Sequence, residues 1–220
     1  MKNKNPKQDA NDYYKKFGKE KKRALSSGIV IVDDEESDID ELRETLVGIV
    51  SRRMIVDYVS SSQEILVDMK EKAKCKPYSA LITDFNMDGI TGKQLIQIVT
   101  GRLNGIDNFV VPNITSFNQV EDAVLKECLC GAFTSVADYA RFRLKYENIV
   151  MILHSSSNYG DGNNDLPDNV DFVHKRSSNP CEQIVDILRD KNVLTARELK
   201  IYKGEIQPKY FDCDDNFVFS

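Results

Sequence analysis

Short apolar segments alternate with longer amphipathic segments along most of this 220-residue chain. Short apolar runs bounded by helical periodicity are typical of buried parallel strands, which carry apolar residues on both faces. Five segments fit this description: residues 28–32, 54–59, 80–83, 149–153 and 170–174. The pattern therefore predicts an α/β fold in which parallel strands alternate with helices.

The segments between these strands carry helix-forming signals. Ile39, Leu42, Leu46 and Ile49 form an apolar stripe at helical spacing, and Ser61–Glu64 has the composition of a capping box. The predicted helices lie at about 37–49, 61–74, 92–102 and 179–188. We therefore expect a helix after each of the first three strands and another after the fifth.

A long insertion interrupts the alternation before the fourth strand. About 45 residues, roughly 103–147, separate the third helix from that strand, where short connections are the rule. The capping box at 116–119 predicts a helix that Gly131 ends, and 135–146 predicts a second one. Residues 155–171 are rich in Ser, Asn, Asp and Gly, so we expect a loop there.

Charge divides the chain into three parts. Residues 1–27 contain nine Lys and Arg against three acids, a net charge of +6. Since the whole chain has a net charge of −5, the remaining residues carry −11. We expect a flexible basic arm at 1–27, one domain at 28–192 and a tail at 193–220. The acidic body disfavours nucleic acid, for which the arm is the only candidate.

Two further observations bear on the compartment. The five cysteines are an odd number without metal-ligand spacing, which favours reduced thiols. No apolar run reaches 18 residues, so the sequence predicts a cytoplasmic protein with no membrane partner.

Acidic residues follow two of the strands and a lysine follows another. Asp33 and Asp34 follow the first strand, Asp84 follows the third, and Lys175 follows the fifth. The carboxyl ends of parallel strands meet at one edge of the sheet, where such folds bind ligands. Three carboxylates there would repel one another unless a divalent cation, a lysine or both offset them. The pattern predicts a cation pocket.

These residues belong to motifs that resemble the receiver domain of bacterial two-component response regulators. The segment IVIVDDE at 29–35 matches that family's first strand and acidic pair, and DFNMDGITG at 84–92 matches its phosphoacceptor loop. Ser155, Phe172 and Lys175 stand at three further family positions. The resemblance covers 28–192 apart from the insertion. It implies a flavodoxin-like fold, with a five-stranded parallel sheet, helices on both faces and a helical insertion before strand four.

The resemblance implies that Asp84 accepts a phosphoryl group from a sensor histidine kinase or a phosphotransfer protein. Mg²⁺ would be held by the carboxylates of Asp33, Asp34 and Asp84, with Asp33 acting mainly through water, and by the backbone carbonyl of Asn86. Such a domain is not an enzyme beyond its own phosphotransfer and dephosphorylation.

Three more residues receive roles from the same resemblance. Lys175 would pair with the aspartate or the phosphate, and the Ser155 hydroxyl would bond to a phosphoryl oxygen. Phe172 would be the switch that remodels the surface at strand five. Output would be a protein–protein contact with a target that the sequence does not identify, and homodimerisation stays open.

Several residues depart from the family pattern. Asp88 and Arg176 each replace a proline, and no fourth helix is predicted within 156–169, so we expect the helical insertion to occupy its groove. These departures favour an alternative, a phosphorylation-independent interaction module (a pseudo-receiver). An aspartyl phosphatase would ordinarily have an acid where Asn86 stands.

The two histidines, His154 and His174, each directly precede a predicted site residue. We expect them to face one another as packing residues, on the side opposite Ser155 and Lys175. His154 could itself occupy the hydroxyl position, but Ser155 is preferred because that chemistry suits a small hydroxyl.

Overall fold

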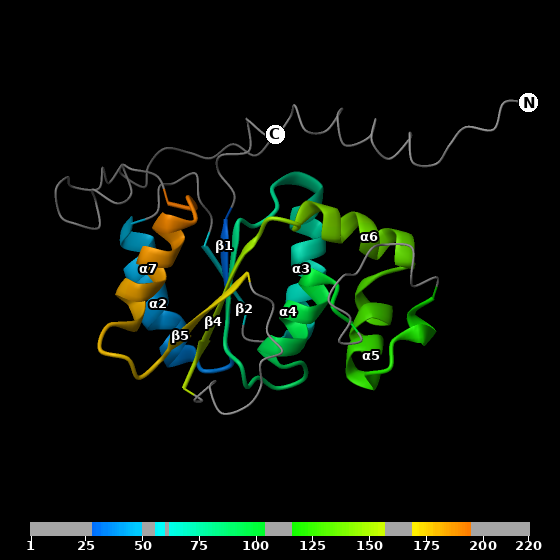
Figure 1. Ribbon diagram of the computed structural model, residues 1–220, viewed down its shortest axis with the longest axis horizontal. Coiled ribbons are helices and arrows are strands. Elements are labelled where there is room, and N and C mark those ends of the chain that lie inside the picture. The colour runs from blue at the N-terminus through cyan, green and yellow to red at the C-terminus, as the bar shows by residue number, and fades with distance from the viewer. Residues whose placement is uncertain (1–27, 50–55, 60–61, 104–115, 157–168, 195–220) are drawn as a thin grey trace, which may run out of the picture.

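Five parallel strands form the central sheet in the computed structural model, in the order β2-β1-β3-β4-β5 (Figure 1). The structure describes residues 28–49, 56–59, 62–103, 116–156 and 169–194. Its strands are β1 Ile29–Val32, β2 Val56–Val59, β3 Ala80–Thr83, β4 Val150–Ser155 and β5 Val170–His174. The predicted α/β class and the parallel sheet are confirmed. The basic arm and nearly all of the predicted tail lie outside the described residues.

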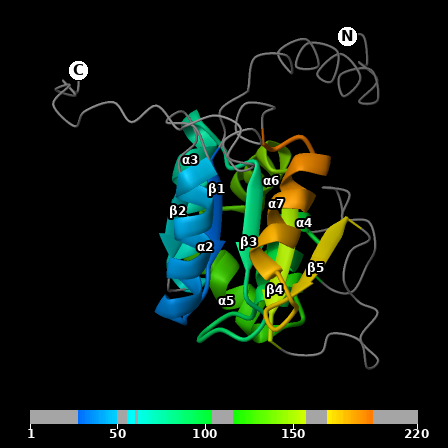
Figure 2. The same cartoon turned by 90° about the vertical axis from the view of Figure 1, so that its left-hand side faces the viewer.

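Helices cover both faces of this sheet. Helices α2 (Glu36–Ile49) and α7 (Pro180–Asp190) lie together on one face, and α3 (Ser62–Cys75) and α4 (Gly92–Thr100) lie on the other (Figures 1 and 2). Strand β1 contributes Ile29 and Ile31 to the core under α2 and α7, while Val30 and Val32 join the core under α3 and α4. The uninterrupted apolar sequence of β1 thus reflects burial on both faces.

The insertion forms a further helical layer on the outer side of α3 and α4 (Figure 1). Its described part, from residue 116 onward, contains the short 3₁₀ helix η2 (Phe117–Gln119), α5 (Ala123–Ala132) and α6 (Val136–Lys145). The prediction of two helices in this insertion is correct, but their boundaries differ from the predicted ones.

The predicted capping box at 116–119 is confirmed, but it begins the short helix η2 and not α5. The prediction that Gly131 ends the first helix of the insertion was wrong. Ser116 caps η2, whereas the N-cap of α5 is Asp122, whose carboxylate accepts hydrogen bonds from the backbone N–H of Val124 and Leu125 at 2.9 and 3.1 Å. Gly131 lies inside α5. Glycine lowers helix stability without ending a helix by itself, and the packed residues on both sides of it hold the helix together.

The insertion does not occupy the groove expected for a fourth helix. The hydroxyl of Tyr139 donates to the Ile98 carbonyl at 2.6 Å, and that of Tyr146 donates to the Met69 carbonyl at 2.8 Å. These carbonyls belong to α4 and α3, so the insertion is anchored to the helices rather than to β4 and β5. The apolar stripes of α5 and α6 predicted burial but carried no information about which surface would bury them. The segment 157–168, where we expected a loop, lies outside the described residues.

Lysine 70 adds a polar anchor to the same interface. Its ammonium lies 2.7 Å from Asp138 and donates to the Ala132 carbonyl at 2.9 Å, so α3 holds both α5 and α6. None of the helices within the described ranges is long and apolar enough to cross a membrane.

Candidate functional site

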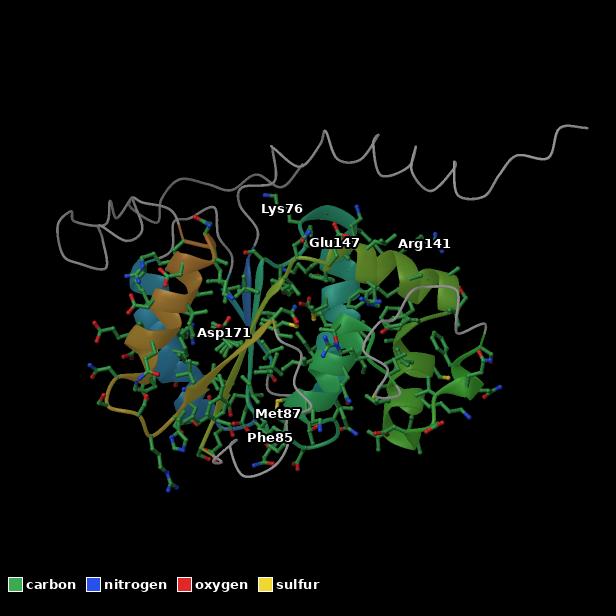
Figure 3. All side chains as sticks on the ribbon, in the orientation of Figure 1. Lys76, Phe85, Met87, Arg141, Glu147 and Asp171 are labelled. Atoms are coloured by element: carbon green, nitrogen blue, oxygen red, sulfur yellow. The ribbon has the colours of Figure 1, made fainter. Side chains whose placement is uncertain are left out.

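The structure brings three of the predicted site residues together at the carboxyl edge of the sheet. The Lys175 Nζ lies 2.8 Å from Asp33 Oδ2 and 3.2 Å from Asp84 Oδ1. Phe85 and Met87 mark this edge in Figure 3, whereas Asp171 lies well back from it. Residues from β1, β3 and β5 therefore meet at one point, as the parallel order of the strands requires.

A fourth residue, Asp38, belongs to the same cluster and was not predicted from the sequence. Its Oδ2 lies 2.6 Å from the Lys175 ammonium. Asp38 stands in the first turn of α2, where a negative charge interacts favourably with the helix dipole. The sequence signal was its position at the start of the helix that follows Asp33 and Asp34, because that turn must lie beside the strand end.

The cluster retains an excess of negative charge. Asp33, Asp34, Asp38 and Asp84 together with Lys175 sum to a formal charge of −3 if all five groups are ionised. Burial raises the pKa of Asp33, whose side chain is only 2% exposed, and the hydrogen bond from Lys175 opposes this shift. Burial alone would lower the pKa of Lys175, but its bonds to Asp33 and Asp38 outweigh burial and raise it. The lysine is therefore held as a cation.

Backbone N–H groups fix the orientation of the carboxylates. Glu35 N donates to Asp33 Oδ1 at 3.0 Å, and Asn86 N donates to Asp84 Oδ2 at 2.7 Å. The exposed Asp34 accepts a bond from Asp88 N at 3.3 Å, which links the loops after β1 and β3. The site is therefore arranged by its own loops as well as by the lysine.

Glycine 92 allows the loop after β3 to fold tightly against Asp84. Its N–H donates to the Phe85 carbonyl at 3.0 Å. A Cβ atom at this position would lie 1.8 Å from the backbone carbonyl oxygen of Asp84. Thr91 then caps α4 through a capping box with Gln94. The position thus requires glycine for lack of space, and the loop geometry around Asp84 depends on it.

Ser155 and His154 lie on opposite faces of the sheet. In the register of β4 and β5, His154 pairs with Val173 and Ser155 pairs with His174. Because strand side chains alternate, His154 shares the α2–α7 face with Val173 and Lys175, while Ser155 points toward the face covered by α3 and α4. The expectation that the two histidines face one another opposite Ser155 and Lys175 was wrong, because the register pairs Ser155 with His174.

Phe172 lies half-buried on the Ser155 face of β5 and packs against the core under α3 and α4. Its ring is edge-on to that of His174, with the ring centroids 6.4 Å apart. The backbone N–H of Lys175 donates to the Ser155 carbonyl at 2.9 Å, so the ends of β4 and β5 are directly joined.

The donor types at this edge suit a hard divalent cation, although their present spacing is set by the lysine. Carboxylate and carbonyl oxygens are the ligands that Mg²⁺ prefers, and the surplus negative charge favours a cation. Among the described residues, no three His, Cys, Asp or Glu side chains are grouped so as to hold a metal ion. Asp33 and Asp84 are instead drawn toward Lys175.

No family model matches the sequence, and no curated protein matches it. The resemblance to receiver domains therefore remains a prediction from the motifs. The geometry itself offers an oriented carboxylate, Asp84, beside an ammonium that Asp33 and Asp38 hold in an acidic cluster.

Proposed function

We propose that this chain is a phosphorylation-dependent signalling domain of the response-regulator receiver type, with Asp84 as the phosphoacceptor. The observation that carries the proposal is the contact of Lys175 with both Asp33 and Asp84 at the carboxyl edge of the sheet. The strand order β2-β1-β3-β4-β5 with helices on both faces is consistent with a flavodoxin-like fold of five strands.

The reaction would be an in-line transfer from a phosphohistidine of a histidine kinase or phosphotransfer protein. A carboxylate oxygen of Asp84 forms a bond to phosphorus while the P–N bond of the donor breaks, and the imidazole leaves and takes up a proton. Lys175 lies within 3.2 Å of the attacking carboxylate and would offset negative charge on the incoming phosphoryl oxygens.

A phosphoryl group would add further negative charge to a cluster of side chains that already has an excess of it. Asp34 and Asp84, the Asn86 carbonyl and, through water, Asp33 would hold Mg²⁺, which when bound neutralises charge on the phosphoryl oxygens. The contribution of the chain is to orient Asp84 through the Asn86 N–H and to hold Lys175 protonated.

A phosphorylation-independent interaction module is the second candidate. The observation that favours it is the insertion, which covers the outer side of α3 and α4 and gives the domain an additional surface. The exposed Asp88 and Arg176, at positions where the family has proline, are also consistent with it.

A titration with Mg²⁺ and beryllofluoride, a mimic of an aspartyl phosphate, tests the first candidate against the second. We expect amide resonances of residues at the carboxyl ends of the strands to shift when Mg²⁺ and beryllofluoride are added together to the wild type. The same resonances should stay unchanged in Asp84→Asn. Asp171→Asn is the matched control, since this carboxylate pairs with Lys191 at 3.3 Å away from the edge. A wild type that does not respond would refute the phosphoacceptor role and favour the constitutive module.

A further inference from the structure

His154 is a buried polar side chain without a partner in the described part of the chain. Only 5% of its surface is exposed, and neither Nδ1 nor Nε2 has a hydrogen bond there. Buried polar groups nearly always have a partner, and leaving one without a hydrogen bond is costly. The ring thus has hydrogen-bonding capacity that the described residues do not use.

The strand register places this ring beside the phosphoacceptor. Thr83 pairs with Leu153, so that Asp84 and His154 follow as the next residues on neighbouring strands. Because strand side chains alternate, the side chains of Asp84 and His154 both lie on the α2–α7 face of the sheet, as does that of Lys175. Asp84 and His154 thus stand next to one another at the carboxyl ends of β3 and β4, and the charges of Lys175 and Asp84 both act on the imidazole.

A purely apolar role does not account for this residue. The position lies between Ile152 and the paired Val173 at the edge of an aliphatic core, where an aliphatic side chain would fill space without an unmet hydrogen bond. Burial and the nearby Lys175 lower the pKa of His154 to about 4, so the ring is neutral and carries one N–H donor and one acceptor nitrogen. A neutral donor beside a carboxylate suits an anion that arrives at that carboxylate.

We propose that His154, rather than Ser155, donates the hydrogen bond to a phosphoryl oxygen on Asp84. This inference rests on the proposed function and identifies a further residue of the same site. In the register of β4 and β5 the Ser155 side chain alternates onto the face of Phe172, whereas His154 shares the face of Lys175. The imidazole would meet the anion from its present face. Among the described residues no group satisfies the ring, so the phosphoryl group would supply the hydrogen bond that it lacks there.

The test uses the full chain with Mg²⁺ and beryllofluoride, comparing the dissociation constant of beryllofluoride among variants. His154→Phe retains an aromatic ring without a donor, and Ser155→Ala removes the neighbouring hydroxyl. Because hydrogen bonds to charged groups are among the stronger ones, we expect His154→Phe to weaken binding by roughly tenfold or more. We expect Ser155→Ala to change binding by about twofold or less.

A second measurement reads the hydrogen bond in the wild type itself. In proton–nitrogen correlation spectra of the ring, beryllofluoride should produce a slowly exchanging His154 N–H signal that is absent from Asp84→Asn. A packing role would not generate this signal, and the measurement does not depend on how well the His154 variant folds.

The outcomes separate this inference from the proposed function. If the wild type binds beryllofluoride through Asp84 but His154→Phe binds equally well, or no ring N–H signal appears, the role of His154 is wrong and the phosphoacceptor role stands. Loss of binding in Ser155→Ala alone would return the role to the serine. A wild type that does not bind would overturn both.

Discussion

Removing the ammonium from the carboxylate cluster should destabilise the protein strongly. In Lys175→Met the aliphatic stem remains, but Asp33, Asp38 and Asp84 lose a cation at 2.8, 2.6 and 3.2 Å. The side chains of Asp33 and Asp84 are 2% and 7% exposed, so solvent screens their repulsion poorly. Breaking buried ion pairs in this way typically costs about 3–5 kcal/mol. Asp38 is 26% exposed and contributes less, so we expect a loss of about 3 kcal/mol at pH 7.5.

Urea unfolding followed by circular dichroism, in the presence of a chelator, measures this loss in the free energy of unfolding. The hydrogen bond from Lys175 lowers the pKa of Asp33 against the upward effect of burial. Without Lys175, folded Asp33 takes up a proton at higher pH, which relieves the repulsion. The destabilisation should therefore be largest at pH 7.5 and become smaller as the pH falls to 5.

Lys191→Met is the matched control. Lys191 lies 3.3 Å from Asp171, but its side chain is 45% exposed, and exposed pairs contribute at most about 1 kcal/mol. Equal losses in the two variants, or a Lys175→Met loss that grows as the pH falls, would refute the assignment of Lys175 as the counter-ion of a buried acidic cluster.

Three further substitutions test separate parts of the structure. In Gly92→Ala the new Cβ would lie 1.8 Å from the Asp84 carbonyl oxygen. We therefore expect the free energy of unfolding in urea to fall by about 2–3 kcal/mol and beryllofluoride to bind more weakly. Wild-type values of both would contradict the close approach. Tyr146→Phe removes the 2.8 Å bond to the Met69 carbonyl and should cost about 1 kcal/mol in the same assay, whereas no loss would mean that the bond does not anchor the insertion. The pKa of His154 is about 4 in the folded protein and about 6.5 in the unfolded chain, so the unfolded state binds more protons between these two pH values. His154 should therefore lower the free energy of unfolding of the wild type by roughly 2 kcal/mol as the pH falls from 7 to 5. His154→Phe should lose that part of the pH dependence, and an unchanged slope would contradict it.

The sheet edge could be predicted from the sequence because its signals are local. Asp33, Asp84 and Lys175 each follow a short apolar strand directly, and parallel strands bring such positions together whatever the intervening chain does. Asp38 escaped prediction because its contact with Lys175 depends on how α2 is turned about its axis, which a capping pattern does not fix.

The assignment of Ser155 depended on register, which the sequence leaves open by one residue. Such a slip moves every side chain of a strand to the other face, so the same apolar run suits either His154 or Ser155 beside Asp84. In the structure the pairing of Leu153 with Thr83 fixes the register and places His154 next to Asp84 on the neighbouring strand. Docking of the insertion was equally open, since an amphipathic helix shows that it is buried but not against which surface.

The position of the insertion also has a consequence for the order of folding. Strand β4 pairs with β3 through Ala80 and Val150, 70 residues apart in sequence, and such distant pairing slows folding. Docking of α6 through the Tyr146–Met69 bond would bring the start of β4 next to α3 and shorten the remaining chain search. We therefore expect Tyr146→Phe to slow refolding more than it speeds unfolding in chevron experiments. A change confined to the unfolding rate would mean that the sheet closes first and that the insertion docks onto a finished domain.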